Sequence, residues 1–311
     1  MRTAVIGLGV IGKVHLGEML NCSNVVATCD IDESKRALCP DVPFYTDYKK
    51  MLDEVKPDVV HVATPHYLHA EMTIYALERN INVLCEKPLA ISEEQLCAIL
   101  DAEEKSKAIL GVCQQNRFND NNAFVKEYLK DKKVINGVGV VPWARGKAYY
   151  DSGAWRGKWA TEGGGVLINQ ALHTLDLLIW FCGKPVSQVN TVDNISLDGV
   201  IEVEDTATIC AKTEKGSFNF FATNASPQGL PVELTLYADG NTVKLLPNMA
   251  IINGEVTRFE KKDALGKDCY GSSHAVVIRK FYECVEKGEH FPIDGNEGAT
   301  VVRSILSCYK K

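Results

Sequence analysis

Short apolar runs alternate with amphipathic stretches over the first 117 residues of the chain. Each run is bounded by polar residues, glycine or proline, as the buried strands of a parallel sheet are. A helix is predicted at 11–20, and another at 92–106, where Ser92 and Gln95 fit a capping box. Repeated strand–helix units predict an α/β fold with a doubly wound parallel sheet. The predicted strands are residues 3–6, 25–30, 59–63, 82–85 and 110–114.

The pattern changes after Arg117, where strands follow one another without helices between them. Asp239-Gly240 and Asn253-Gly254 are typical hairpin turns, so this sheet is predicted to be antiparallel. We therefore place a Rossmann-type domain at 1–117 and an α+β domain at 118–311. Strands are predicted at 134–144, 186–192, 206–211, 217–222, 232–238 and 242–246, and helices at 122–130, 167–180, 273–287 and 296–309.

Composition narrows the class of protein. A length of 311 residues allows two domains, and 46% hydrophobic with 24% charged residues is ordinary for a globular protein. The net charge of −6 indicates neither a nucleic-acid nor an anionic-membrane partner. No window approaches the roughly 20 apolar residues of a membrane span. A strand that starts at Thr3 leaves no room for a signal peptide, so we expect a cytoplasmic location.

The eleven cysteines do not indicate a metal site or a disulfide framework. No two of them form a C-x-x-C pair, and most lie in apolar runs, where cysteine acts as a small hydrophobic residue. We therefore expect reduced thiols and no bound metal.

A glycine-rich turn, Gly7-Leu8-Gly9-Val10-Ile11-Gly12, matches the GxGxxG dinucleotide fingerprint. It follows a strand and opens a helix, which is the context that the fingerprint requires. Gly7 permits the tight turn, Gly9 the approach of the pyrophosphate and Gly12 close helix packing. The diphosphate would lie at the helix N-terminus, so we assign Val10 and Ile11 to the cofactor site as well. An ordinary glycine-rich turn is the alternative.

Asp30 ends the second predicted strand, 18 residues after Gly12. A carboxylate there accepts hydrogen bonds from the adenosine ribose and repels a 2′-phosphate, which favours NAD over NADP. Lys35 and Arg36 lie nearby and weaken this inference, because either could reach a phosphate. We assign Asp30 and the adjacent Ile31 to the cofactor site.

Two further turns follow buried strands, at the sheet edge where open α/β folds bind ligands. Thr64-Pro65-His66 is assigned to the cofactor site, and His69 is interpreted as packed or solvated. In Glu86-Lys87-Pro88, a charged pair comes directly after the strand at 82–85, and proline fixes the turn. Glu86 and Lys87 are assigned to the same site.

Three glycines at 163–165 precede the helix predicted at 167–180. Asn169 and His173 are four residues apart and would share a helix face, and Asp176 could orient the imidazole. An imidazole titrates near neutrality and therefore suits proton transfer, although a structural histidine is the alternative.

Trp155 and Arg156 lie on the link that precedes these glycines. Aromatic and basic groups there suit sugar stacking or phosphate contact, and aromatic packing at the junction is the alternative. We assign both residues to substrate binding.

These motifs together resemble the glucose–fructose oxidoreductase, inositol dehydrogenase and MocA family of NAD(P)-dependent enzymes. The resemblance rests on the GxGxxG turn, Thr64-Pro65, Glu86-Lys87-Pro88 and the glycine-rich segment with His173, and it spans most of the chain. It implies a Rossmann domain followed by a domain with a large open, mainly antiparallel sheet. It also implies a homodimer or homotetramer formed through that sheet.

The resemblance implies roles as well. Lys87 would hydrogen-bond the reacting hydroxyl, His173 would be the general acid/base, and hydride would pass to nicotinamide. Inositol-dehydrogenase-like members carry aspartate four residues before the histidine, where this chain has Asn169, which positions substrate but takes no proton. We predict an NAD-dependent dehydrogenase of a sugar, polyol or sugar derivative. An NAD-dependent redox-neutral glycosidase and a non-catalytic NAD-sensing regulator are the alternatives.

Overall fold

The structure, a computed structural model, describes residues 1–260 and 273–309. The chain divides into two compact units. The first holds Met1–Gln115 and Ser272–Ala299, and the second holds Asn116–Gly271 and Thr300–Lys311. The sequence-based division into 1–117 and 118–311 was therefore wrong for the segment near the C-terminus, which returns to the first unit.

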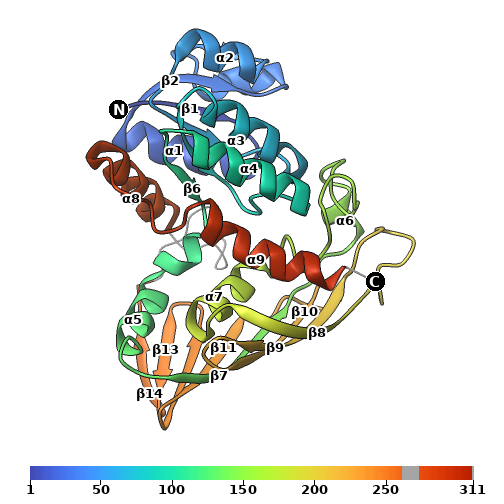
Figure 1. The fold of residues 1–311 in the computed structure, drawn as a ribbon. Coiled ribbons are helices and arrows are strands. Elements are labelled where there is room, and N and C mark those ends of the chain that lie inside the picture. The colour runs from blue at the N-terminus through green and yellow to red at the C-terminus, as the bar shows by residue number, and fades with distance from the viewer. Residues whose placement is uncertain (261–272, 310–311) are drawn as a thin grey trace. The chain divides into compact units, whose positions relative to one another are not determined.

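The first unit is built on a parallel sheet, which lies among helices α1 to α4 in Figure 1. Its strand order is β3-β2-β1-β4-β5-β6. Every residue of β4 is buried, as expected for a strand covered on both faces. The strands predicted for this part of the chain are present. The two-residue β3 was not predicted, because so short a strand leaves no hydrophobic pattern. The bounds are β1 Arg2–Ile6, β2 Asn24–Cys29, β3 Phe44–Tyr45, β4 Val59–Val62, β5 Asn82–Cys85 and β6 Leu110–Val112.

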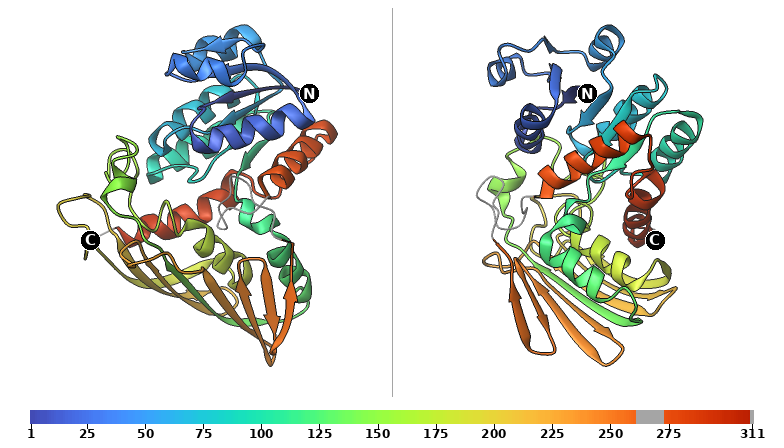
Figure 2. Two further views of the ribbon diagram at one scale, coloured as in Figure 1. Left: turned by 180° about the vertical axis from the view of Figure 1, so that it is seen from behind. Right: turned by 90° about the vertical axis from the view of Figure 1, so that its left-hand side faces the viewer.

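Helices cover this sheet, with α1 beside α8 and α3 beside α4 (Figure 2). The predicted capping of α4 is confirmed, since the Ser92 hydroxyl accepts from the Gln95 N–H at 3.2 Å. Helix α8 belongs here because its Phe281 packs over Gly111, where an added Cβ would lie 2.7 Å from the ring. The bounds are α1 Val10–Cys22, α2 Tyr48–Val55, α3 His69–Leu77, α4 Glu93–Lys105 and α8 Ser273–Lys287.

The second unit is built on a sheet with the order β14-β13-β12-β11-β7-β10-β9-β8. The β7–β10 pair is parallel and the other neighbouring pairs are antiparallel, as predicted for a mainly antiparallel sheet. Buried and exposed residues alternate along β9 and β10, so one face of the sheet is covered and the other is not. The bounds are β7 Val134–Pro142, β8 Pro185–Asp193, β9 Thr206–Thr213, β10 Ser217–Thr223, β11 Glu233–Ala238, β12 Asn241–Leu246, β13 Met249–Ile252 and β14 Glu255–Arg258.

Helix α7 (Leu172–Cys182) packs closely on β7 of this sheet. Two glycines make the approach possible: a Cβ added at Gly137 or Gly139 would lie 2.8 or 2.9 Å from Leu178. The other helices of the unit are α5 Asp120–Tyr128, α6 Lys147–Tyr150 and the later turns of α9 Gly295–Cys308.

The helix predicted at 167–180 begins later, at Leu172. Residues 166–171 instead form turns, in which the Ala171 N–H donates to the Val166 carbonyl at 2.8 Å. Asn169 therefore does not lie on the same helix as His173, and the prediction of a shared helix face was wrong. Gly163 at φ +83° and Gly164 at φ +149° have a left-handed backbone. The Glu204 carboxylate binds the N–H groups of Gly165 and Leu167 directly after them, so the backbone forms turns before the helix begins.

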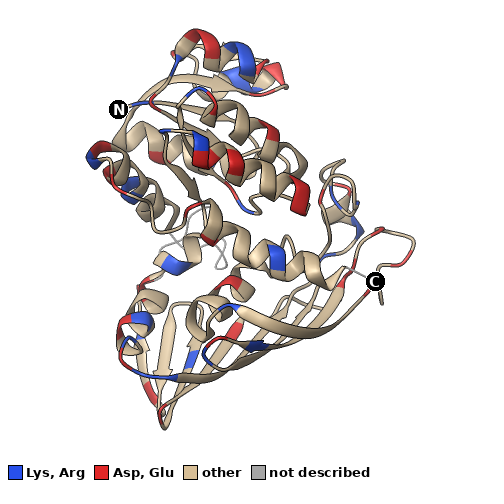
Figure 3. Ribbon diagram, in the orientation of Figure 1, with Lys and Arg blue, Asp and Glu red and all other residues tan. Residues whose placement is uncertain are grey.

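The surface and the cysteines agree with an ordinary globular composition. Lys and Arg are interspersed with Asp and Glu on the helices of the first unit and along the second (Figure 3). Within the described residues, every cysteine is a free thiol, and Cys269 lies outside them. No helix in the described ranges combines the length and the apolar character that crossing a bilayer requires.

Candidate active site

The carboxyl ends of three neighbouring strands, β1, β4 and β5, carry the predicted cofactor turns of the first unit. The glycine turn follows β1 with Gly7 at φ +91°, a conformation that glycine adopts readily. A Cβ added at Gly12 would lie 1.9 Å from the Gly7 carbonyl oxygen, so the helix start packs directly on the turn. Both glycines therefore act as the fingerprint requires.

The space beside Gly9 is open. Gly9 is the N-cap of α1, and a Cβ added there would meet nothing within 4 Å. Two residues assigned to the cofactor site from the sequence have exposed apolar side chains: Val10 is 63% exposed and Ile31 is 91% exposed. A phosphate group at this helix N-terminus would meet N–H groups and the positive end of the helix dipole.

Asp30 supports the glycine turn directly. Its Oδ2 accepts from the Leu8 N–H at 2.7 Å, and its Oδ1 accepts from the Asp32 N–H at 2.9 Å. The carboxylate thus lies beside the turn that would hold the pyrophosphate. Each carboxylate oxygen can accept more than one hydrogen bond, so these contacts are compatible with the predicted bonds to ribose.

His69 connects the second and third turns. Its Nδ1 lies 2.7 Å from the Pro88 carbonyl oxygen, and its Nε2 lies 2.8 Å from the Thr64 carbonyl oxygen. The ring is 1% exposed, which confirms that it is packed. Burial lowers the pKa of His69, and the two carbonyls partly oppose that shift. The imidazole thus lies between the Thr64 and Lys87-Pro88 turns, and its neutral form donates to one of the two carbonyls.

Glu86 holds the backbone of Lys87. Its Oε2 accepts from the Lys87 N–H at 3.2 Å, and the Lys87–Pro88 peptide bond is cis. The Glu86 side chain is only 4% exposed and points into the core, where its Oε1 accepts from His15 Nε2 at 2.9 Å. Any contact of Glu86 with a cofactor would therefore come through its backbone.

A buried chain of hydrogen bonds continues from Glu86. His15 Nδ1 lies 2.8 Å from His61 Nδ1, and His61 Nε2 lies 2.9 Å from the Tyr282 hydroxyl. The pKa of His61 lies well below its ordinary value, mainly because the ring is buried and secondly because His15 is next to it. The His61 ring is therefore neutral and carries one hydrogen, which serves one of its two contacts.

His274 and Cys113 complete this cluster, and with His15 and Glu86 they place four ligand-type atoms within 4.8 Å of one another. The spacing alone would suit a metal ion. However, a carboxylate only accepts, so His15 Nε2 carries the hydrogen that it donates to Glu86 and has no lone pair for a metal. Burial acts to raise the pKa of Glu86, but the hydrogen bonds and charges of His15 and His274 hold it well below its ordinary value.

In the second unit, Asn169 belongs to a network of buried polar groups. Its Nδ2 donates to Glu162 Oε1 at 2.5 Å and lies 3.3 Å from the Tyr149 hydroxyl. Glu162 is 0% exposed, and its Oε2 accepts from the Gly157 N–H. Gln170 Nε2 also donates to the Tyr149 hydroxyl, at 3.0 Å. The network thus connects the turn before α7 to the segment around residue 157.

Arg156 and Trp155 adjoin the same network. The Arg156 guanidinium lies over the rings of Tyr149 and Trp155, at 4.4 and 4.5 Å from their centroids, and donates to the Tyr149 hydroxyl. The two predicted substrate-binding residues therefore lie together, and Tyr149 links them to Asn169.

Glu204 fixes the backbone that leads to Asn169. Its carboxylate accepts from the N–H groups of Gly165 and Leu167 at 2.9 and 3.0 Å, and from the Tyr309 hydroxyl at 2.8 Å. Burial raises the pKa of Glu204 to about 7, although these donors act to lower it. This carboxylate explains locally why residues 165–167 form a turn.

Helix α7 carries both His173 and Asp176. His173 is 7% exposed and lies in the first turn of the helix. The Asp176 carboxylate accepts two hydrogen bonds from Arg117, at 2.6 and 2.7 Å, and both side chains are buried. The suggested contact of Asp176 with the imidazole stays a prediction.

The predicted residues thus fall into two groups. Lys87 and the cofactor turns lie in the first unit, whereas His173, Asn169, Trp155 and Arg156 lie in the second. Sequence reasoning missed Glu162 and Glu204 as parts of the site. The position of Glu162 directly before three glycines was the available signal, because a carboxylate next to a strained turn often accepts backbone N–H groups.

Comparisons with known proteins agree with this geometry. The family described as "Oxidoreductase family, NAD-binding Rossmann fold" matches residues 1–114. The family described as "GFO/IDH/MocA C-terminal domain" matches residues 133–243. The D-glucoside 3-dehydrogenase of Escherichia coli (strain K12) is 32% identical over 208 residues, which are 61% of this chain and 56% of that protein.

Two further proteins are similar over more of the chain. The inositol 2-dehydrogenase of Salmonella typhimurium (strain LT2) is 23% identical over 70% of this chain and 65% of that protein. The matched segment therefore spans only part of these curated relatives. The solved structure of the WlbA dehydrogenase from Chromobacterium violaceum, in complex with NADH and UDP-GlcNAcA, has a TM-score of 0.85. It is 26% identical and covers 99% of this chain and 92% of that chain, which confirms the predicted fold class. The chain therefore belongs to the GFO/IDH/MocA family of oxidoreductases, with an NAD-binding Rossmann domain at its N-terminus.

Proposed function

We propose that this protein is an NAD-dependent dehydrogenase acting on a secondary alcohol of a sugar, a polyol or a sugar derivative. The observation that carries the proposal is the position of Lys87. It lies two residues after the end of β5, two strands away from the glycine turn on β1, at the same carboxyl edge of the sheet. A cation at that edge is placed to meet the reacting end of a dinucleotide held by the turn.

Nicotinamide, when bound, supplies the hydride acceptor. The side chain of Lys87 is proposed to hydrogen-bond the reacting hydroxyl and to stabilise the alkoxide that develops as its proton leaves. The hydrogen bond from the Lys87 N–H to Glu86, and the contact of Pro88 with His69, fix the backbone from which this side chain extends.

His173 is proposed to take that proton as general base, and Asn169 to position the substrate. Both lie close in sequence to the glycine turns that Glu204 holds, so their backbone is well fixed. Trp155 and Arg156 are proposed to contact the substrate beyond its reacting carbon. NAD is preferred over NADP in this proposal because Asp30 lies beside the cofactor turn.

The test is the appearance of NADH when the protein meets NAD and a panel of substrates. The panel contains glucosides, inositols and UDP-linked sugars, because relatives or structural neighbours are named for these classes. Lys87→Ala is the control: its turnover should fall at least the ~10²-fold typical of an acid–base group, with NADH binding unchanged. Unchanged turnover in that variant would remove Lys87 from the mechanism.

The same assay separates the two alternatives. A redox-neutral glycosidase would cleave a glycoside without net NADH formation. A regulator would bind NADH without turning over any member of the panel. If the wild-type protein cleaves a glycoside without forming NADH, the glycosidase proposal replaces the dehydrogenase proposal. If it binds NADH but turns over no member of the panel, the regulator proposal replaces it. A cytoplasmic location is part of the proposal and is tested by cell fractionation.

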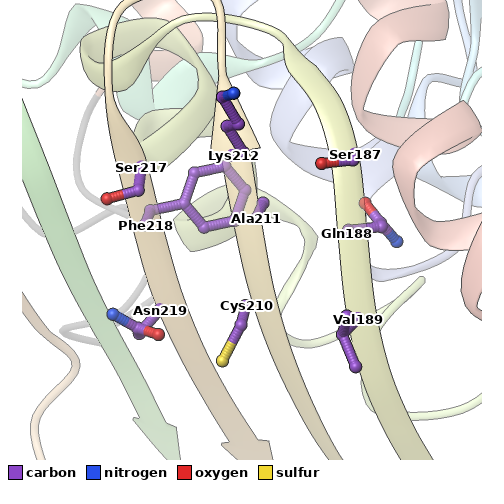
Figure 4. Close-up of a pocket in the computed structure, with 9 residues that line it drawn as sticks. All are labelled: Ser187, Gln188, Val189, Cys210, Ala211, Lys212, Ser217, Phe218 and Asn219. Atoms are coloured by element: carbon purple, nitrogen blue, oxygen red, sulfur yellow. The ribbon is translucent and has the colours of Figure 1, made fainter.

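The assembly proposed for this protein is a homodimer or homotetramer formed through the sheet of the second unit. The uncovered face carries exposed apolar side chains, including Val189 at 78%, Phe221 at 37% and Tyr237 at 44%. Figure 4 shows Val189, Cys210 and Asn219 in one row across β8, β9 and β10, in a hollow of about 330 Å³. Light scattering of the wild type and of Phe221→Asp tests this: a monomeric wild type would overturn the proposal.

A further inference from the structure

We propose that Glu162 sets the hydrogen-bonding polarity of position 169. Its buried carboxylate holds the nitrogen of the Asn169 amide, so Asn169 offers its carbonyl oxygen as the acceptor for a substrate hydroxyl. The Glu162–Asn169 contact is observed in the second unit. The contact of Asn169 with a substrate rests on the proposed function. Glu162 is thus a positioning residue that acts through Asn169.

The chemistry of the pair decides which way the amide lies. Both oxygens of Glu162 receive donors, Oε1 from Asn169 Nδ2 at 2.5 Å and Oε2 from the Gly157 N–H. When Glu162 is ionised it has no hydrogen to give, and the atom of Asn169 that faces it is then the nitrogen. The carbonyl oxygen of the same planar amide then points away from Glu162. The orientation follows from Glu162, independently of how amide atoms are assigned.

Glu162 also couples the two predicted substrate-binding segments. The N–H that it binds belongs to Gly157, directly after Trp155 and Arg156. Gly157 has φ +70°, and a Cβ added there would lie 2.6 Å from Ile201, so this turn has little freedom. One fully buried carboxylate therefore fixes the turn that bears Arg156 and the amide of Asn169 together.

The pair explains why position 169 holds an amide. A carboxylate at 169 would face Glu162 at hydrogen-bond distance, and two buried carboxylates so close cannot both ionise. Asn169→Asp should therefore bind a proton that the wild type does not bind. Exchanging both groups, in Glu162→Gln with Asn169→Asp, leaves one carboxylate and one amide, and their hydrogen bond forms in the reverse direction.

The first experiment needs no substrate. Thermal unfolding is measured at pH 5 and pH 8 for the wild type, Asn169→Asp, Glu162→Gln and the double variant, with the exposed Glu202→Gln as a matched control. Asn169→Asp should lose roughly 5 °C or more at pH 8 relative to pH 5, beyond the change in the wild type. The double variant should lose this pH dependence. A pH dependence that persists in the double variant, or is absent from Asn169→Asp, overturns the pairing.

The second experiment measures KM and kcat with a substrate found in the panel, and with its analogue that lacks one hydroxyl. In Glu162→Gln the amide oxygen accepts from the Gly157 N–H and the NH2 group faces Asn169, so the Asn169 amide turns over and no longer presents its carbonyl oxygen to the substrate. KM should rise about 10-fold for the full substrate and little for the analogue that lacks the contacted hydroxyl. The double variant should recover most of this loss, since an acceptor again stands at 169.

The two arms separate two failures. If no substrate turns over but the pH-dependent unfolding behaves as stated, the dehydrogenase proposal fails and the Glu162–Asn169 pair stands. If turnover is found and Glu162→Gln raises KM equally for substrate and every deoxy analogue, Glu162 acts on folding alone and the inference fails. The dehydrogenase proposal would survive that result.

Discussion

The imidazole of His15 donates from Nε2 to Oε1 of Glu86 across 2.9 Å, and neither side chain is more than 5% exposed. His15 lies in the helix that follows the glycine turn, and Glu86 immediately precedes Lys87. One buried contact therefore joins the element that would bind the diphosphate to the turn that would act on the substrate.

Replacing this imidazole should destabilise the first unit. His15→Leu leaves the buried Glu86 carboxylate without a principal donor and removes the partner of His61 Nδ1. We expect the free energy of unfolding to fall by about 1.5–3 kcal/mol, the range for hydrogen bonds to charged groups. Urea denaturation measures it, with the exposed Lys13→Ala as control, and equal midpoints for the two variants would contradict the assignment.

Two glycines of the fingerprint should respond differently to the same substitution. Gly12→Ala places a Cβ 1.9 Å from the Gly7 carbonyl oxygen, a backbone atom that cannot move aside. It should lower the free energy of unfolding by at least about 3 kcal/mol. Gly9→Ala meets no protein atom within 4 Å, so its stability should stay near wild type. Its affinity for NADH should nevertheless fall at least about 10-fold, because the methyl group occupies the space proposed for the pyrophosphate.

Thermal melts and fluorescence titration with NADH measure both effects of these glycine variants. A Gly9→Ala protein that binds NADH like the wild type would show that the dinucleotide does not approach this turn.

The buried Arg117–Asp176 ion pair should contribute far more to stability than an exposed ion pair with the same N···O distance. Asp176→Asn leaves the Arg117 guanidinium buried without its carboxylate, which should cost about 3–5 kcal/mol. The matched control is Asp151→Asn, which breaks the exposed Lys147–Asp151 pair, also 2.6 Å apart, and should cost less than about 1 kcal/mol. Chemical denaturation measures the free energy of unfolding of both variants. Similar decreases in the two would show that burial does not strengthen the Arg117–Asp176 pair.

Glu204 should make stability depend on pH near neutrality. Its pKa is about 7 in the folded protein and near the ordinary 4.5 when the chain is unfolded, so between these values the folded state binds more protons. The contribution of Glu204 to stability should therefore be fully present below about pH 4.5 and should be lost as the pH rises through 7, a change of about 3 kcal/mol.

Glu204→Gln removes that contribution. The difference in unfolding free energy between wild type and Glu204→Gln, followed from pH 5 to pH 8, should change by about 2.5 kcal/mol, whereas the exposed Glu202→Gln should show no such trend. A difference that is constant across the range would mean that Glu204 does not titrate there.

Local patterns predicted the elements well where one periodicity dominated. The parallel strands are short apolar runs, and the turn chemistry of Asp239-Gly240 matches an observed hairpin between β11 and β12. The pattern could not show which sheet α8 covers. Its apolar face, with Val277, Ile278 and Phe281, would suit either sheet, and the choice depends on Gly111, which is remote in sequence.

The site was predictable only where a motif fixed it. The glycine turn and the Glu86-Lys87 pair stand out because both directly follow strands. Glu162 and Glu204 look like ordinary polar residues, since their burial depends on partners such as Gly157 and Tyr309 that other parts of the chain provide. The late start of α7 was missed for the same reason, because Glu204 holds the N–H groups of Gly165 and Leu167 from 39 and 37 residues away.

The return of residues 272–299 to the first unit means that the cofactor module is not a contiguous stretch of sequence. A fragment cut at residue 115 would lose Tyr282 and His274, so His61 and Glu86 would face an open core. Exchanging Rossmann modules between relatives would therefore need two segments moved together. Recombination at the obvious midpoint would break the hydrogen-bonded chain that steadies Lys87, even though every motif stayed intact.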